Sequence, residues 1–301
     1  MPELPEVETI ARGLAKRVTG DAIEDAWLGE KPEPLKSPAK EIVAALEGKT
    51  IEAVRREGKH IVFELVGSRP PEARAAGRGM GGVARAGTAA PTSRAPAPAE
   101  TLRAQWVVHL GMTGRLQVCD PDDEIAKHTH AIARLASGRE LRFVDPRRFG
   151  RLSVVTTADF DAGGVEPLDV DLERFVGLFR GRKVFIKSAL LNQKLLRGVG
   201  NIYADESLFR AGIRPRRRAA TLTRVELTKL HRAIKDVLRE AIKAGGSSIS
   251  DYVDANGDEG FFQLRHRVYG RESEPCLKCK TPIKRVVIGG RSSHYCPRCQ
   301  R

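Results

Sequence analysis

Apolar residues in the first part of the chain follow a helical pattern at the N-terminus and a strand pattern after it. The N-terminal pattern predicts a helix over about residues 3–18, with three glutamates in or near its first turn, where the helix dipole favours negative charge. Its apolar positions are Val7, Ile10, Ala11, Leu14 and Val18.

Eight short runs of β-type residues, separated by Gly, Pro and Asp, predict an antiparallel sandwich or barrel. The expected strands are Ala22–Leu28, Thr50–Arg55, His60–Val66, Gln105–Leu110, Gly114–Val118, His130–Ala136, Arg139–Val144 and Arg151–Val155. Segment 68–100 breaks the pattern, since it holds 10 Ala, 5 Gly, 5 Pro and 5 Arg but no Leu, Ile or aromatic residue. Because it can bury little apolar surface, we expect a disordered insertion between two strands.

The pattern becomes helical after about residue 170. Helices are expected over Ile186–Leu196 and Asn201–Ala211, separated by a Gly-Val-Gly turn. A third helix follows a capping box of Thr223 and Glu226 and ends at Gly245. Helices joined by such turns often hold a nucleic-acid backbone. We therefore expect an α+β multi-domain chain, with an N-terminal domain over 1–155, a linker over 156–171, a helical domain over 172–251 and a cysteine-rich tail over 252–301.

The chain of 301 residues carries 52 Lys and Arg against 38 Asp and Glu, a formal charge of +14. Such an excess points to a polyanionic partner. No run reaches the roughly 18 apolar residues that a membrane span needs, and the acidic start MPELPEVETI lacks the features of a secretion signal. We therefore expect a cytoplasmic protein that binds nucleic acid and no membrane, and a monomer by default.

Four of the five cysteines form the most specific spacing in the chain, Cys276-x2-Cys279-x16-Cys296-x2-Cys299. Two such Cys-x-x-Cys turns supply four thiolates to a tetrahedral Zn²⁺. Disulfides do not suit a cytosolic protein, and a redox pair needs only one Cys-x-x-Cys. We expect one structural zinc ion without an open position for chemistry, and no organic cofactor. Cys119 is interpreted as a buried or incidental thiol.

Pro2 follows the initiator Met1, and a small second residue permits removal of that methionine. The new terminus would be a secondary amine with a pKa of about 8, far below that of lysine, so roughly a tenth of it would be neutral and nucleophilic near pH 7. Attack of such an amine on a sugar C1′ gives an iminium ion, which favours elimination of the neighbouring phosphates. The alternative is that Pro2 merely starts the helix, and the residue types alone favour it.

Five motifs, in order, carry a resemblance to a known family. They are Met1–Thr9 (MPELPEVET), His109–Gly114 (HLGMTG), Asp145–Gly150 (DPRRFG), Gly198–Ala204 (GVGNIYA) and the four-cysteine tail. The chain closely resembles the bacterial formamidopyrimidine-DNA glycosylases over nearly its whole length except 68–100. Leu4 and Gly260–Phe262 look more like this branch than like the endonuclease VIII type, which typically begins Pro-Glu-Gly-Pro-Glu.

The resemblance implies an N-terminal β-sandwich carrying the N-terminal helix, a helix–two-turns–helix domain and a C-terminal zinc ribbon, with DNA between the two halves. It implies excision of oxidised purines, such as 8-oxoguanine and formamidopyrimidines, from double-stranded DNA, and β,δ-elimination at the abasic site. Under this resemblance Pro2 becomes the Schiff-base nucleophile, Glu3 protonates the ribose O4′, and Lys59 is the catalytic lysine near the target phosphate. From its position alone, Lys59 would be a solvated lysine at a strand end.

The same resemblance assigns residues that would lie against DNA. Met112, Arg147 and Phe149 would fill the gap left by the extruded nucleotide, whose stacking and pairing are lost. Without the resemblance, Met112 and Phe149 fit a core and Arg147 a solvated basic turn. The further candidates are Glu6, His128, Arg148, Lys187, Asn201 and Arg291. Glu6 could instead stabilise the helix start, and Ser247–Phe262 matches the family's lesion-recognition loop.

Two other hypotheses stay open. One is an oxidised-pyrimidine glycosylase of the endonuclease VIII type, and the other is a non-catalytic DNA-binding zinc protein that keeps the scaffold. The presence of Pro2, Glu3 and Lys59 together argues against the second. The insertion is expected to be neutral for activity.

Overall fold

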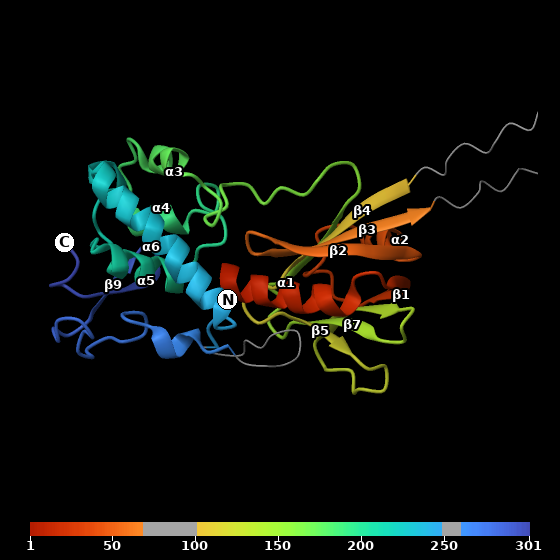
Figure 1. Ribbon diagram of the computed structural model, residues 1–301. Coiled ribbons are helices and arrows are strands. Elements are labelled where there is room, and N and C mark those ends of the chain that lie inside the picture. The colour runs from red at the N-terminus through yellow and green to blue at the C-terminus, as the bar shows by residue number, and fades with distance from the viewer. Residues whose placement is uncertain (69–100, 249–259) are drawn as a thin grey trace, which may run out of the picture.

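The computed structural model describes residues 1–68, 101–248 and 260–301. The expected insertion, apart from Ser68, and most of the expected lesion-recognition segment lie outside these residues. Figure 1 shows two halves along one long axis: strands around a helix in the N-terminal half, and helices with a small hairpin in the C-terminal half. No helix of the described residues has the length and apolarity that a membrane crossing requires.

All eight expected strands are present in the N-terminal half. They are β1 (Ala22–Leu28), β2 (Lys49–Glu57), β3 (His60–Ser68), β4 (Thr101–His109), β5 (Arg115–Cys119), β6 (Thr129–Leu135), β7 (Glu140–Val144) and β8 (Arg151–Val155). The short helix α2 (Ala39–Leu46), to which the sequence pattern assigned no element, buries Ile42, Ala45 and Leu46.

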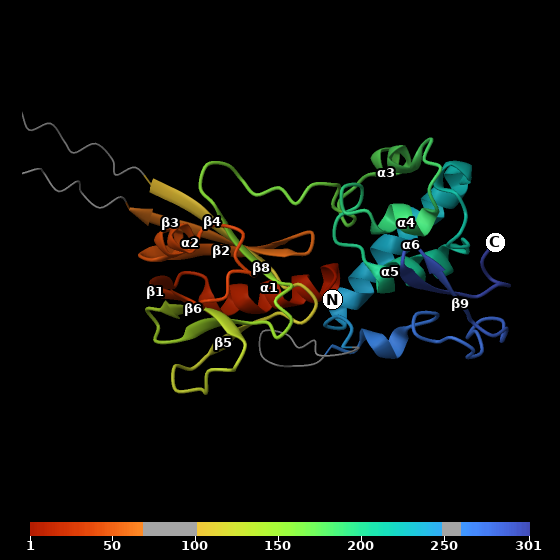
Figure 2. The same ribbon diagram turned by 180° about the vertical axis from the view of Figure 1, so that it is seen from behind.

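The strands form one continuous antiparallel sheet in the order β5-β7-β6-β1-β2-β3-β4-β8. β1 belongs to both layers of the expected sandwich, because it pairs with β6 over most of its length but with β2 only at its first two residues. Helix α1 (Leu4–Val18) lies between the β2-β3-β4 layer and the β5-β7-β6 layer in both views (Figures 1 and 2). Its expected apolar positions are all buried, so the sandwich and its N-terminal helix are confirmed.

The described part of the C-terminal half contains four α-helices, two short 3-10 turns and one hairpin. The α-helices are α3 (Leu172–Phe179), α4 (Ile186–Leu191), α5 (Asn201–Ala211) and α6 (Arg224–Lys243). The turns and strands are η1 (Ala219–Thr221), η2 (Phe262–Arg265), β9 (Lys284–Ile288) and β10 (Arg291–Tyr295).

The sequence pattern predicts the start of α6 correctly but not the end of α4. The Thr223 hydroxyl accepts the Glu226 N–H and the Glu226 carboxylate accepts the Thr223 N–H, so the expected capping box opens α6. α4 ends at Leu191 rather than at the expected Leu196. The helix ends because the backbone of Asn192 is extended. The chain then forms a turn in which the Leu196 N–H donates to the Asn192 carbonyl.

α1 also joins the two halves of the molecule. Val7 packs in the core of the sheet, but Leu4, one turn earlier, packs in the separate core of the helical half. The first turn of α1 is therefore inserted into the C-terminal half. This insertion brings the N-terminus to the junction of the two halves (Figure 1).

Candidate active site

The turn that precedes α5 holds the N-terminus of α1. The Leu4 N–H donates to the Gly198 carbonyl at 3.0 Å, and Glu3 Oε1 accepts the Ile202 N–H at 3.1 Å. Gly200 permits this approach, because a Cβ atom there would overlap the Glu3 carboxyl group. The Gly-Val-Gly turn of the sequence therefore binds the N-terminal end of α1.

Glu3 is the acid that this arrangement buries. Its side chain is 3% exposed, and burial raises its pKa to about 7, an effect that the nearby Lys59 charge opposes. Its Oε2 atom has no hydrogen-bond partner among the described residues. Near neutral pH, Glu3 can therefore hold a proton on a free carboxyl oxygen and release it, as a general acid must.

Lys59 lies at the tip of the β2–β3 hairpin. It is 8% exposed, unlike the solvated lysine that its position alone suggested. Burial lowers its pKa, while the charges of Glu3 and Glu6 oppose this shift and that of Arg291 adds to it. These interactions place the hairpin tip in the same electrostatic surroundings as Glu3.

The chain terminus lies in these surroundings too. Burial lowers the pKa of the Met1 α-amino group, against the opposing charges of Glu3 and Glu6. Pro2 is half-buried and follows Met1 directly. Removal of Met1 would therefore leave the Pro2 amine next to Glu3, in a setting that favours its neutral form.

Glu6 is 2% exposed, so its side chain is turned into the protein rather than toward a ligand. Its carboxylate accepts the N–H groups of Glu3 and Ser247, each at 2.8 Å, and the Tyr203 hydroxyl. Burial raises its pKa. These bonds support the alternative that Glu6 stabilises the helix start, and they tie α1 to α5 and to the segment after α6.

Lys187 is fully buried, which differs from the expected position against DNA. Its Nζ donates to Asp205 Oδ1 at 2.6 Å and to the Ser292 carbonyl at 2.7 Å. The other Asp205 oxygen accepts the His294 N–H at 2.8 Å. α4 and α5 therefore hold β10, whose first residue is the exposed Arg291. In this structure Lys187 holds β10 in place, and its expected contact with DNA stays a prediction.

The remaining expected phosphate contacts lie at or near the surface. Asn201 is half-buried at the start of α5, and its Nδ2 lies 3.4 Å from Ser292 Oγ on β10. His128 is exposed. Arg148 is exposed and pairs with Glu33 at 2.8 Å, a bond that a phosphate would have to replace.

Two loops present Met112 and Phe149 to solvent, 40% and 52% exposed, so neither side chain packs in a core. The fully buried Asp145 joins the loops. Its carboxylate accepts the Thr113 hydroxyl from one loop at 2.6 Å and a backbone N–H from the other at 2.7 Å. The Arg147 guanidinium lies 4.9 Å from the centroid of the Phe149 ring. The side chains expected to enter the duplex therefore share one support.

His109 is a residue of the HLGMTG motif to which the sequence assigned no role. Its Nδ1 accepts the Gly111 N–H at 3.0 Å, and burial lowers its pKa to about 3, so the ring stays neutral and keeps this acceptor. Its ring centroid lies 4.9 Å from that of His60, the residue after Lys59. His109 therefore links the Lys59 hairpin to the loop of Met112.

The four expected zinc ligands converge. Their Sγ atoms lie within 4.8 Å of one another, and those of Cys279 and Cys296 are 3.4 Å apart. Four thiolates are the donor set of a closed tetrahedral zinc site, so the residues fit one structural zinc ion. Both Cys-x-x-Cys turns flank the β9–β10 hairpin, and the ion would therefore hold the hairpin that carries Arg291.

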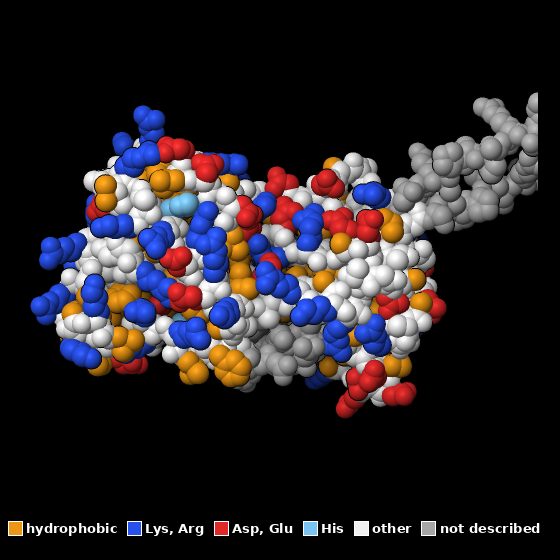
Figure 3. All heavy atoms as spheres, viewed as in Figure 1, with side chains coloured by type: hydrophobic (Ala, Val, Ile, Leu, Met, Phe, Trp, Pro, Cys, Tyr) orange, Lys and Arg blue, Asp and Glu red, His pale blue; other side chains and the backbone are white. Residues whose placement is uncertain are grey.

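Three groups lie close together where the two domains join. They are Glu3, whose pKa is near neutral, the chain terminus and the buried Lys59. Figure 3 shows Lys and Arg side chains spread over both halves and across this junction. Together, the fold and the site are those of an enzyme that acts on a polyanion, with a buried acid suited to proton transfer beside the chain terminus.

Family models identify the enzyme more closely. The "Formamidopyrimidine-DNA glycosylase N-terminal domain" matches residues 1–152, the "Formamidopyrimidine-DNA glycosylase H2TH domain" matches 164–253, and the "Zinc finger found in FPG and IleRS" matches 273–301. The chain therefore belongs to the formamidopyrimidine-DNA glycosylase family, whose members are bifunctional DNA glycosylases and AP lyases. The fold class, the enzyme class and the structural zinc ion expected from the sequence are confirmed, while the limits of the domains stay predictions.

Relatives and solved structures agree with this assignment. The formamidopyrimidine-DNA glycosylase of Solibacter usitatus is 43% identical over 100% of both chains, and that of Shouchella clausii is 38% identical over 100% of this chain and 99% of its own. The Lactococcus lactis Fpg, solved with DNA containing an abasic site, is 31% identical over 99% of each chain, with a TM-score of 0.81. The MutM (FPG) protein of Thermus thermophilus is 38% identical over 99% of this chain and 98% of its own, with a TM-score of 0.78.

Proposed function

We propose that this chain removes oxidised purines, 8-oxoguanine and formamidopyrimidines, from double-stranded DNA and then cleaves the abasic site by β,δ-elimination. It works in base-excision repair, in the bacterial cytoplasm. Structures of relatives support the substrate class: a Lactococcus lactis Fpg mutant was solved with DNA containing Fapy-dG, and MutM with DNA containing carbocyclic 8-oxo-G. The observation that carries the proposal is Glu3, held beside the N-terminus with a pKa that burial raises to about 7.

The reaction begins at Pro2 after Met1 has been removed. The secondary amine attacks C1′ of the damaged nucleotide and loses its proton, while the bond from C1′ to the base breaks and the base leaves with that electron pair. Glu3 donates a proton to O4′, and the sugar ring opens. The product is an iminium ion between the Pro2 nitrogen and C1′.

The iminium ion acts as an electron sink for the elimination steps. A proton leaves C2′ and the 3′ phosphate departs; in the second elimination a proton leaves C4′ and the 5′ phosphate departs. Lys59, whose pKa burial lowers, lies at the hairpin tip where it would exchange protons with these leaving groups. Water then hydrolyses the iminium ion and restores the free amine of Pro2.

The exposed residues open and position the duplex. Met112 and Phe149 fill the space of the extruded nucleotide, and Arg147 hydrogen-bonds the unpaired cytosine. Zinc acts only by holding the hairpin of Arg291. The proposed phosphate contacts are His128, Arg148, Asn201 and Arg291.

A second substrate class is favoured by one solved neighbour. The wild-type Lactococcus lactis Fpg, 30% identical with a TM-score of 0.80, was solved with DNA that contains an oxidized pyrimidine. Single-turnover excision of 8-oxoguanine opposite cytosine and of thymine glycol separates the two classes. Faster excision of thymine glycol would show that oxidised pyrimidines are the main substrates.

Borohydride trapping on a duplex that contains 8-oxoguanine tests the proposal. Reduction of the iminium ion links protein to DNA, and mass spectrometry should find the sugar on the peptide that begins with Pro2. Lys59→Ala serves as the control, because it should still form the adduct at Pro2 on a preformed abasic site. An adduct on a lysine, or no adduct with any lesion, would overturn the proposal.

A further inference from the structure

A network of ion pairs lies behind the hairpin that carries Lys59. Arg56, whose side chain is 7% exposed, donates from Nη1 and Nη2 to the two carboxylate oxygens of Glu166 at 3.0 and 2.9 Å. Its Nε donates to Glu8 of α1 at 2.7 Å. Its Nη1 also donates to the carbonyl of Gly58, the residue before Lys59, at 3.2 Å.

Arg197 connects the helical half to this network. Its Nη1 donates to Glu57 at 3.1 Å, and its Nε donates to Glu166 at 3.4 Å. Arg197 directly precedes Gly198, whose carbonyl accepts the Leu4 N–H at the start of α1. The Glu166 carboxylate therefore joins the hairpin of the catalytic lysine to the turn that seats the N-terminus.

Stability alone does not explain such a network. Buried ion pairs often add little net stability, because the cost of desolvating both charges offsets their attraction. A bidentate Arg–carboxylate pair does fix orientation, and here it fixes segments that are 110 residues apart in the sequence. Within the described residues no hydrogen bond holds the Lys59 amine, so its place depends on the backbone of the hairpin.

We propose that Glu166, which accepts hydrogen bonds from Arg56 and Arg197, is a positioning residue for the reaction. It sets the distance between the Lys59 amine and the centre formed by Glu3 and the N-terminal amine. This inference rests on the proposed role of Lys59. Catalytic groups must be held within about 0.5 Å of the productive geometry, so loss of one bond behind the hairpin should slow the chemistry.

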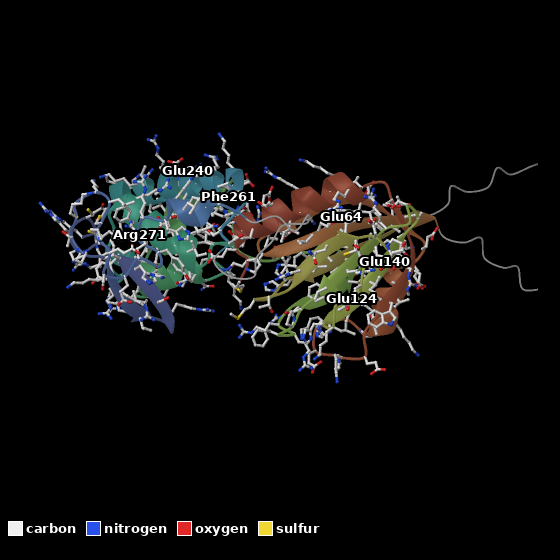
Figure 4. The ribbon with its side chains drawn as sticks, turned by 90° about the horizontal axis from the view of Figure 1, so that it is seen from below. Glu64, Glu124, Glu140, Glu240, Phe261 and Arg271 are labelled. Carbon is white, nitrogen blue, oxygen red and sulfur yellow. The ribbon has the colours of Figure 1, made fainter. Side chains whose placement is uncertain are left out.

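Glu166→Gln tests the proposal, because it keeps the size of the side chain and one carbonyl oxygen but removes the charge. The matched control is Glu240→Gln. Glu240 lies on α6 of the helical half (Figure 4) and accepts two hydrogen bonds from the Arg210 guanidinium, each at 2.7 Å. The control therefore removes the charge from another bidentate pair. Glu166→Gln should slow single-turnover strand cleavage at a preformed abasic site, the step assigned to Lys59, about tenfold, as expected for a small misplacement of a catalytic group. The Kd for the duplex should stay close to that of Glu240→Gln, whereas the Tm should fall further, because Glu166→Gln removes one carboxylate from the buried Arg56 while Glu240 is partly exposed.

The deciding measurement is the double variant with Lys59→Ala. If Glu166 acts through Lys59, Glu166→Gln should cause no further loss of rate in the Lys59→Ala background. A merely structural role would lower the rate equally in both backgrounds. Arg197→Lys, which keeps the charge but cannot bond two carboxylates in the same way, should show the same dependence on Lys59, and it decides the question if Glu166→Gln does not fold.

Each outcome bears on a definite statement. An undiminished rate in Glu166→Gln, or an equal loss in both backgrounds, would overturn the positioning role. A fully active Lys59→Ala, or an unaltered chain without excision activity, would overturn the proposed function instead.

Discussion

The expected site residues fall into two regions with opposite physical settings. Glu3, Glu6 and Lys187, which with Lys59 form the buried centre, are each at most 3% exposed, whereas Met112 and Phe149 of the exposed wedge are 40% and 52% exposed. One resemblance assigned both regions to the neighbourhood of DNA. The structure separates the groups proposed for proton chemistry, which are taken out of water, from the side chains proposed to open DNA, which water covers until the duplex arrives.

The two regions should also fail in different ways. Charges in the buried centre are costly unless they are paired or neutralised, so changes there should alter pKa values, reaction rate and stability together. The apolar side chains of the wedge are free of the core, so changes there should alter the reaction on duplex DNA and leave stability nearly unchanged. Each substitution below tests one side of this contrast.

The largest effect is expected at the buried acid. Glu3→Gln should slow base excision by about 10²–10⁴-fold, the usual contribution of a general acid, while a preformed abasic site is still trapped on Pro2. Single-turnover rates on the two substrates measure the difference. Glu41→Gln, an exposed change on α2, is the control and should act like the unaltered chain. Equal losses on both substrates would mean that Glu3 is not specific to base release.

The raised pKa of Glu3 also predicts a pH dependence of stability. The folded chain keeps a proton on Glu3 up to about pH 7, whereas the unfolded chain loses it near 4.5. The contribution is therefore fully present below pH 4.5 and lost as pH rises through 7. The difference in pKa, 7 − 4.5 = 2.5, corresponds to about 3 kcal/mol. Urea unfolding at several pH values should show this slope, and the slope should disappear in Glu3→Gln. An unchanged slope in that variant would contradict the shifted pKa.

Loss of the zinc ligands should have an intermediate effect. Cys296→Ser should release about one equivalent of zinc and unfold the ribbon, so that Arg291 loses its support. Binding to duplex DNA should weaken about tenfold, the cost of one or two charged hydrogen bonds. Atomic absorption and titration of a labelled duplex measure the two effects. Cys119→Ser, outside the cluster, is the control, and equal zinc content in the two variants would refute the assignment.

A smaller effect is expected at the wedge. Phe149→Ala should slow excision from duplex DNA about three- to tenfold, the worth of one aromatic contact. Its Tm should match that of the unaltered chain, because the ring is 52% exposed. Melting curves and excision rates together check both statements. A large drop in Tm would place Phe149 with the buried centre and remove the contrast between the regions.

Much of the fold could be predicted because its signals are local. Turn residues separate the strand segments along the chain. Thr223 and Glu226 form their capping box within four residues. The short α2 follows Pro38 and has only eight residues, so its pattern was too brief to predict. The expected end of α4 was wrong because Asn192 turns the chain, a choice that depends on where the following segment must go.

The site was predictable in its residue types but not in its burial. Motif resemblance placed Lys187 and Glu6 near DNA, yet their partners come from distant segments. Ser292 lies 105 residues after Lys187, and Tyr203 lies 197 residues after Glu6. The network around Glu166 has the same long-range character. No local pattern encodes such contacts, so only the fold shows which charged residues position others rather than touch DNA.

The smallest effect is expected far from both regions, at the ends of β3 and β4. Ser68 pairs with Thr101, so the two strand ends are adjacent, and an Asn-Gly turn could replace residues 69–100. These ends lie at the far end of the N-terminal half from the junction (Figure 1). Excision should stay within about twofold of the full chain, the range of ordinary surface changes. The removed segment carries five arginines, so duplex binding is compared at low and moderate salt to find any weak attraction. A tenfold loss of turnover would show that the segment serves one of the two regions after all.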